Sequence, residues 1–346
     1  MRLFKIMAIH TAIVASMCGS LAVGQTTVPS SRFRPLPAES PEATAPLTEF
    51  SAFDYDAQMF APYDLRDLDE PTGPVGFYFT YDRVYTSVSR PGIQSVNDPQ
   101  DNSLVPVGND FMWGNRFELG VMNDDGRGWG GEYTRTSGSF FSSGQDVLIA
   151  TPFMTTTSVN NLKLNRTFRQ ELQNGGWFEP YFGFRFIGIS DNTIEDSLIG
   201  ANPLRFKQNA SNAAYGGHVG ARHVRKYGRW GISTDGSLAL TYNSQRYFST
   251  DIETVGTAFS IFEFYDENSD FSPAADLRGD LSYALTRDLA FRLGAQILYV
   301  WDGVNRANTL PAIFNPNSAF GPGGPNGITT ESFITAGFNF GIEWRR

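Results

Sequence analysis

The sequence alternates between apolar and polar or small residues through most of its length, and this period of two constrains the fold more than any other feature. In residues 230–242, for example, Trp230 and Leu238 share one parity, whereas Asp235 and Ser237 share the other. A β-strand whose successive side chains point to opposite faces has this period. The pattern predicts ten strands, at residues 76–88, 110–123, 128–138, 158–171, 176–190, 212–224, 229–243, 273–286, 289–302 and 331–344.

The connections between these strands alternate in length. Tight turns rich in Asp, Asn and Gly, which suit hairpins, follow the second, fourth, sixth and eighth strands. Connections of about 20 to 30 residues follow the first, third, fifth, seventh and ninth. Short turns at one end and long loops at the other are typical of membrane β-barrels. The sequence therefore predicts an all-β fold, a transmembrane antiparallel up-and-down β-barrel of about ten strands (eight to twelve) over residues 73–346.

Residues 1–24 predict a secretory signal peptide. Two basic residues precede a mostly apolar stretch, and small residues stand at the usual positions before a cleavage site at Gln25. An N-terminal anchor helix is the alternative, but polar residues interrupt an apolar core that is already near the minimum length. A lipoprotein signal at Cys18 fits less well, because Met17 stands where such signals need a small residue.

Cleavage after residue 24 removes the only cysteine. It also removes Arg2 and Lys5, so the formal net charge changes from −9 to −11. The chain then has no disulfides and no basic surplus, so no nucleic-acid partner is expected. Residues 25–72 contain seven prolines and few apolar pairs, which predicts a proline-rich, largely disordered periplasmic segment. The alternative is that its aromatic part, residues 50–68, docks onto the domain that follows.

Charged residues occur in the middle of the predicted strands, on the face opposite the large apolar side chains. In a barrel they would face the lumen and pair there. The rival fold, a soluble periplasmic ligand-binding β-sandwich, offers no reason for the rhythm of the loops. The predicted lumen network comprises Arg116, Glu118, Arg185, His218, Arg222, Asp235, Asp276, Arg278, Asp280 and Arg292.

All six tryptophans lie near the ends of predicted strands. Amphipathic indole rings collect at the two membrane interfaces of a barrel. The predicted membrane-interface girdle has Trp129, Trp177, Trp230 and Trp344 on the periplasmic side and Trp113 and Trp301 on the outer side.

The C-terminal residues 335–342 resemble the assembly signal of bacterial outer-membrane barrels, with a polar residue, a glycine two positions on and hydrophobic residues at alternate places. The common form ends at a Phe, whereas this chain continues to Arg346. Residues 180–186 and 230–236 look similar to porin-like barrels of unknown role in planctomycete-type bacteria. The resemblance implies a location in the bacterial outer membrane, contact with outer-membrane lipid, and recognition of the C-terminal strand by the barrel-assembly machinery.

A barrel of ten strands has a narrow interior, because about eight strands leave room only for side chains and about sixteen or more leave an open channel. We therefore expect a surface or structural barrel that is plugged by ion pairs, or a barrel with a narrow passage. The predicted outer loops are acidic, with a net charge of −5 over residues 244–272. Such a mouth would favour cations in that passage.

An outer-membrane hydrolase, either omptin-like or lipid-modifying, is the enzyme alternative. It needs a histidine with a carboxylate or a serine near the outer mouth. The two histidines that follow the signal peptide are His218 and His223, and the first is predicted at mid-strand on the lumen face. The sequence has no nucleophile elbow, phosphate-binding glycine loop or His-rich metal motif. We expect no catalytic residues, no metal site and no cofactor.

Overall fold

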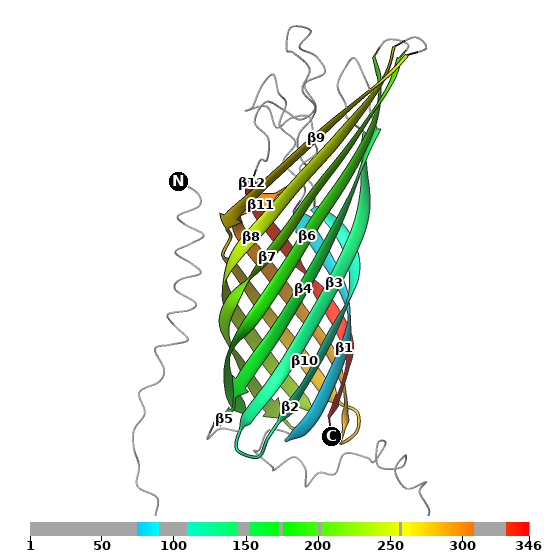
Figure 1. Ribbon diagram of the computed structural model, residues 1–346. Coiled ribbons are helices and arrows are strands. Elements are labelled where there is room, and N and C mark those ends of the chain that lie inside the picture. Colours follow the sequence, from blue (N-terminus) through cyan, green and yellow to red (C-terminus); the bar gives the residue numbers. More distant parts are fainter. Residues whose placement is uncertain are drawn as a thin grey trace, which may run out of the picture. The chain divides into compact units, whose positions relative to one another are not determined.

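The computed structural model describes residues 75–89, 109–143, 152–172, 176–199, 202–255, 258–307 and 330–345. These residues form one antiparallel sheet (Figure 1). In this part of the chain no helix is long and apolar enough to cross a membrane. The strands are β1 (Gly76–Ser89), β2 (Asn109–Met122), β3 (Arg127–Ser143), β4 (Pro152–Phe168), β5 (Gln170–Glu171), β6 (Trp177–Ile199), β7 (Asn202–Tyr227), β8 (Trp230–Val255), β9 (Ala258–Phe271), β10 (Ala274–Ala284), β11 (Leu289–Asn305) and β12 (Thr330–Arg345).

The sheet closes on itself because its first and last strands pair. Thr80 of β1 lies opposite Glu118 of β2 on one side and opposite Glu343 of β12 on the other. Strand β8 pairs with β10 along its first half and with β9 along its second half, so β9 and β10 occupy one strand position. The result is a closed antiparallel barrel of ten strand positions, with the short β5 attached to β6. This confirms the fold class that the alternation predicts.

The alternation also sets which side chains point inward. On β1, Thr80, Asp82 and Val84 are almost completely buried, whereas the residues between them are partly exposed. On β12, Phe338 points outward with 66% of its surface exposed, and Asn339 beside it is fully buried. Most large hydrophobic side chains are therefore outside the barrel, and many of the charged side chains of the strands are inside.

Tight turns connect the strands at one end of the barrel, which we call the turn end. Gly126, between β2 and β3, has a φ of +73°, and its N–H donates to the carbonyl oxygen of Asn123 at 3.0 Å. Gly228, between β7 and β8, has a φ of +60°. Glycine adopts this left-handed conformation without a steric penalty, so both turns reverse the chain within a few residues.

The opposite end of the barrel is called the loop end. Two of the long loops predicted there are wrong, because longer strands occupy those residues instead. Strand β6 continues to Ile199 and β7 begins at Asn202, while β8 continues to Val255 and β9 begins at Ala258. The prediction ended these strands where the apolar alternation ended. The backbone ladder nevertheless continues beyond that point, because backbone hydrogen bonds between strands do not require apolar side chains. The acidic residues of 251–270 therefore lie on strands rather than in a loop.

Several predictions concern residues outside the described part of the chain. These are the signal peptide at 1–24, the proline-rich segment at 25–72, the turn at 173–175 and the connections at 90–108, 144–151 and 308–329.

Candidate functional site

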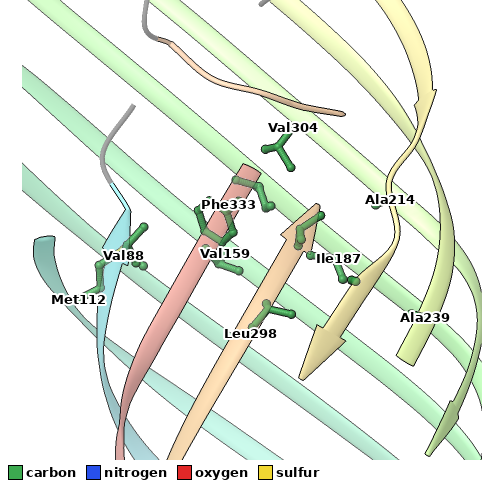
Figure 2. Packing of buried hydrophobic residues seen from close by; sticks show 12 residues of the cluster. Val88, Met112, Val159, Ile187, Ala214, Ala239, Leu298, Val304 and Phe333 are labelled. Atoms are coloured by element: carbon green, nitrogen blue, oxygen red, sulfur yellow. The ribbon is translucent and has the colours of Figure 1, made fainter. Parts of the chain in front are cut away.

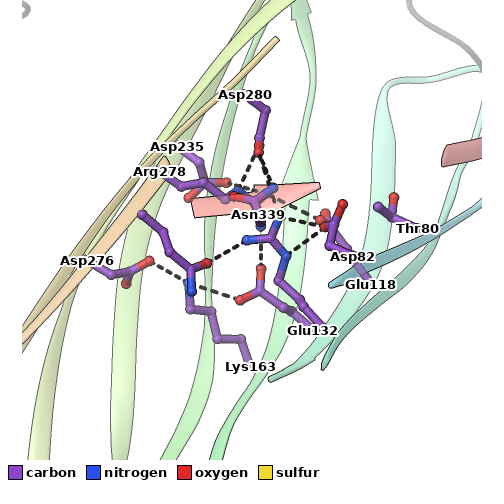
Figure 3. Close-up of polar contacts among 12 residues, drawn as sticks. Thr80, Asp82, Glu118, Glu132, Lys163, Asp235, Asp276, Arg278, Asp280 and Asn339 are labelled. Carbon is purple, nitrogen blue, oxygen red and sulfur yellow. Dashed lines mark hydrogen bonds and ion pairs between the residues drawn. The ribbon is translucent and has the colours of Figure 1, made fainter. Parts of the chain in front are cut away.

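Ionised side chains lie on inward-facing positions in the half of the barrel nearer the turn end, and Figure 3 shows several of them in contact. All ten residues of the predicted lumen network are on inward-facing positions, and nine of them are charged. The cations of this layer are Arg116, Lys163, Arg185, Arg222, Arg278 and Arg292, and its carboxylates are Asp82, Glu118, Glu132, Asp235, Asp276 and Asp280. The two signs balance, as a buried layer requires.

Arg278 of β10 is the centre of this ionic layer. Its guanidinium lies 2.8 Å from Glu132 Oε2, 3.3 Å from Glu118 Oε2 and 3.1 Å from Asp280 Oδ2. These carboxylates belong to β3, β2 and β10. A single guanidinium therefore joins opposite walls of the barrel, and only 6% of its side chain is exposed.

Two further arginines extend the layer toward β1. Both Nε and Nη2 of Arg116 donate to Asp82 Oδ2, at 2.9 and 2.6 Å, and neither side chain is more than 1% exposed. Arg292 of β11 donates to the neighbouring strand β10, with its Nη2 2.7 Å from Asp280 Oδ2. Asn339 of β12 donates to Asp280 Oδ1 at 3.0 Å. The last strand is thus tied to the same carboxylate.

The opposite side of the layer is built around two aspartates. Lys163 and Arg185 donate to different oxygens of Asp276, at 2.6 and 2.5 Å. Arg222 Nε donates to Asp235 Oδ2 at 3.0 Å, and the same guanidinium also pairs with Glu118. Strands β4, β6, β7, β8 and β10 are joined in this way. The interior is therefore cross-linked around its whole circumference.

Three members of the ionic layer are absent from the predicted network, namely Asp82, Glu132 and Lys163. Each lies on a strand that the sequence predicts, at a position of inward parity. The parity of β1, β3 and β4 was therefore sufficient to find them. On these strands the inward face also carries threonine and valine, so the charged positions stand out less than they do on β2 or β10.

His218 of β7 is buried within the barrel wall, with 4% of its surface exposed. Its Nε2 lies 2.7 Å from Asn165 Oδ1, and its ring contacts that of Tyr181 edge-on. The hydroxyl of Tyr181 donates to Asp235 Oδ1 at 2.6 Å. A side chain so enclosed is not accessible to a macromolecular or lipid substrate, so the arrangement does not favour the hydrolase alternative. Within the described residues, no group of three His, Cys, Asp or Glu is placed to hold a metal ion.

An apolar layer crosses the interior between the ionic layer and the loop end (Figure 2). On each strand that contributes to both layers, the apolar residue lies nearer the loop end; Met112 precedes Arg116 on β2, for example. The layer comprises Val88, Met112, Val159, Ile187, Ile189, Ala214, Ala239, Ala274, Leu298, Val300, Val304 and Phe333. These residues come from every strand position of the barrel except β3, and all are at most 8% exposed. The layer therefore places packed hydrocarbon side chains from nine strand positions in the interior at this level.

Beyond the apolar layer, residues 303–307 turn inward across the barrel. The register between β11 and β12 shifts between Val300 and Val304, and Gly303 has a φ of +97°, which a larger residue rarely adopts. The Gly303 carbonyl oxygen accepts from Asn243 Nδ2 at 2.6 Å and from Gln245 Nε2 at 2.5 Å. The segment is therefore held by hydrogen bonds to β8.

Arg306 anchors this inward segment. It forms a fully buried ion pair with Asp191 of β6, its Nη2 donates to the Ser89 carbonyl oxygen at 3.0 Å, and its guanidinium lies 5.0 Å from the centre of the Phe333 ring. Asn305 adds bonds to β7, with its N–H donating to Asn212 Oδ1 at 2.7 Å. Both Arg306 and Asp191 lie outside the predicted strands, so alternation could not identify them.

A cavity of about 40 Å³ remains between the two layers, lined among others by Arg116, Lys163, Arg278 and Leu298. One water molecule needs roughly 10–15 Å³ of such volume. The cavity therefore has space for a few water molecules, and Val159 and Leu298 of the apolar layer are among the residues that line it.

Five of the six tryptophans lie on outward-facing positions. Trp129, Trp230 and Trp344 are on the turn end of their strands, and Trp113 and Trp301 are near the loop end. Arg166 stacks on the Trp129 ring at 4.7 Å, and Arg83 lies 5.4 Å from the centre of the Trp113 ring.

Trp177 differs from the prediction of a lipid-facing ring. It has inward parity on β6, is only 3% exposed, and is covered by the cationic groups of Arg169 and Lys226, at 5.0 and 5.3 Å from its ring centre. Its position at the end of a strand agrees with the prediction, but its neighbours on that face, Glu179 and Tyr181, point into the barrel.

No protein-family model matches the chain, and no curated protein matches it by sequence. Comparison with solved structures finds bacterial outer-membrane proteins. The outer membrane protease OmpT from Escherichia coli is 9% identical with a TM-score of 0.45, covering 79% of this chain and 97% of that one. Neisserial surface protein A is 13% identical with a TM-score of 0.26, covering 80% and 100%, and a major outer membrane protein from Thermus thermophilus is 10% identical with a TM-score of 0.32, covering 78% and 99%. The barrel itself is established by the strand pairing of this chain.

Proposed function

We propose that the protein is a barrel of the bacterial outer membrane whose interior is closed, with a surface or structural role. The observation that carries this proposal is the inverted distribution of side chains. Leu240 and Phe338 are 67% and 66% exposed on the outside, whereas Arg116 and Arg185 are at most 1% exposed on the inside. A soluble protein rarely exposes a continuous apolar surface of this extent, while a lipid-spanning barrel needs one.

The orientation in the membrane follows from the two ends. The turn end carries the start of β1 and the end of β12, and short turns of outer-membrane barrels lie in the periplasm. The loop end, with the extended β6, β7, β8 and β9, then faces the outside. The outward-facing tryptophans at both ends support interface girdles. The partners of this barrel are outer-membrane lipid and, through β12, the barrel-assembly machinery.

The closed interior favours a structural or surface barrel over a passage. Ions crossing the barrel would have to displace residues 303–307, the apolar layer and the ion pairs around Arg278. A narrow passage that prefers cations is the alternative. It requires residues 303–307 to move, and the acidic residues near the loop end would then favour cations. The hydrolase alternative is not favoured, and a sandwich does not agree with one closed sheet. The likeness to planctomycete-type barrels stays a prediction.

Membrane fractionation with gel electrophoresis before and after heating tests the location. We expect the protein in the outer-membrane fraction, and we expect the unheated band to migrate differently from the heated one, because a barrel closed by backbone hydrogen bonds and buried ion pairs resists detergent until it is heated. Recovery in the soluble periplasmic fraction, with the same mobility before and after heating, would overturn the proposal.

A further inference from the structure

A row of polar side chains interrupts the apolar outer surface of the barrel, two residues from Trp113 on β2. Arg83 of β1 lies opposite Asn115 of β2, and Asn115 lies opposite Arg135 of β3. All three have outward parity, with Arg135 exposed and the other two half-buried. Residues paired in this way have Cα atoms about 5 Å apart, so the two guanidinium groups flank one amide.

Within the described residues, the two arginines of this row lack the carboxylate partners that every arginine of the ionic layer has. In the described part of the chain, no carboxylate lies at ion-pair distance from Arg83 or Arg135. By contrast, Arg246, another outward-facing arginine on β8, pairs with Glu267 at 3.1 Å. An unpaired cation on a lipid-facing wall is costly in the hydrocarbon region and far less so beside headgroups. The row therefore carries positive charge where an anion is needed to balance it.

The side chains of the row are held in place. Asn115 Oδ1 accepts from Arg83 Nη1 at 2.7 Å and from the Tyr81 hydroxyl at 3.0 Å. The Arg83 guanidinium also lies over Trp113, which in turn packs on Tyr85 with ring centres 4.6 Å apart. Among the described residues, these contacts engage a single nitrogen of the Arg83 guanidinium, Nη1, as a hydrogen-bond donor. The remaining guanidinium donors and the Asn115 amide group are left to bind an acceptor from outside the protein.

We propose that Arg83, Asn115 and Arg135 bind the phosphate-bearing headgroup of an anionic lipid in the outer leaflet. The planar guanidinium matches the oxygens of a phosphate with two parallel hydrogen bonds. The apolar side chains Phe117 and Leu119, which continue the outer face of β2 toward the turn end, lie along the path of the acyl chains. This inference rests on the proposed function, because the row meets lipid only if the barrel spans a membrane.

Binding of short-chain phosphatidylglycerol to the full chain in zwitterionic micelles, followed by native mass spectrometry, tests the inference. The variant carrying Arg83→Gln and Arg135→Gln is expected to bind this lipid about tenfold or more weakly, since it loses charge-assisted hydrogen bonds. Arg135→Gln alone, at an exposed position that leaves folding intact, is expected to give a smaller loss in the same direction. Arg246→Gln is the matched control, with unchanged binding. Short-chain phosphatidylcholine is expected to bind all variants alike.

Equal binding of phosphatidylglycerol by the double variant and the Arg246 control would overturn the inference. So would full competition by inorganic phosphate at the same concentration, because the site would then recognise free phosphate rather than lipid. Either result in a protein that still shows heat-dependent mobility leaves the proposed function standing. A protein that does not insert into vesicles at all would overturn both.

Discussion

Replacing Arg278 with Met is expected to lower the free energy of unfolding of the barrel by about 3–5 kcal/mol. The substitution removes the cation that the buried carboxylates of Glu118, Glu132 and Asp280 share. Each of them keeps another cation, Arg222, Lys163 and Arg292 respectively, but the layer is left with one uncompensated negative charge, and burying such a charge is costly. Methionine keeps most of the side-chain volume, so the loss reports the charge rather than a large cavity. Urea titration of the chain refolded into lipid vesicles measures the effect.

Arg127→Met is the matched control for this measurement. Arg127 pairs with Asp125 at 3.6 Å in the turn between β2 and β3, and both side chains are more than half exposed. Exposed pairs of this kind contribute about 0–1 kcal/mol. Equal losses for the two variants would contradict the role of Arg278 as the centre of the ionic layer.

Replacing Arg306 with Met is expected to lower the free energy of unfolding by a similar amount, about 3–5 kcal/mol. The ion pair with Asp191 is fully buried on both sides. Its loss strands the carboxylate of Asp191, which among the described residues keeps only the bond from Thr157 Oγ1 at 2.6 Å. The inward segment also loses its bond to the Ser89 carbonyl oxygen. The same urea titration reports the change.

A second substitution separates stranded charge from lost packing. Adding Asp191→Asn to the Arg306 variant removes the unpaired charge, so the double variant is expected to regain part of the lost stability. Arg246→Met provides the control, because its pair with Glu267 is 66% and 51% exposed and contributes about 0–1 kcal/mol. If Arg306→Met changed stability no more than this control, the segment 303–307 would not be anchored as described.

Much of this architecture follows from the sequence because the signal is local. On a strand, parity alone decides which face a side chain occupies, so Arg116 and Asp276 could be assigned to the interior without knowing which strands pair. The partners themselves could not be predicted. Arg278 meets Glu132 across 146 positions of sequence, and only closure of the barrel brings them together.

Other features depend on backbone geometry that alternation does not encode. The continuation of β8 to Val255 has polar residues on both faces, so no apolar pattern indicated it. The inward turn at Gly303 depends on a single left-handed residue and a shift in register. The position of Trp177 at a strand end predicts an interface ring, but the parity that it shares with the inward-facing Glu179 places it inside the barrel.

Conductance across planar lipid bilayers tests the central claim, that the interior of the barrel is closed. The intact protein, first shown by heat-dependent gel mobility to have inserted in vesicles fused with the bilayer, is expected to leave the current at baseline over the applied voltages. We expect this because the apolar layer around Phe333 and the segment anchored by Arg306 both lie across the described interior. Steady, reproducible conductance steps from the inserted protein would contradict the closed barrel and would favour a passage instead.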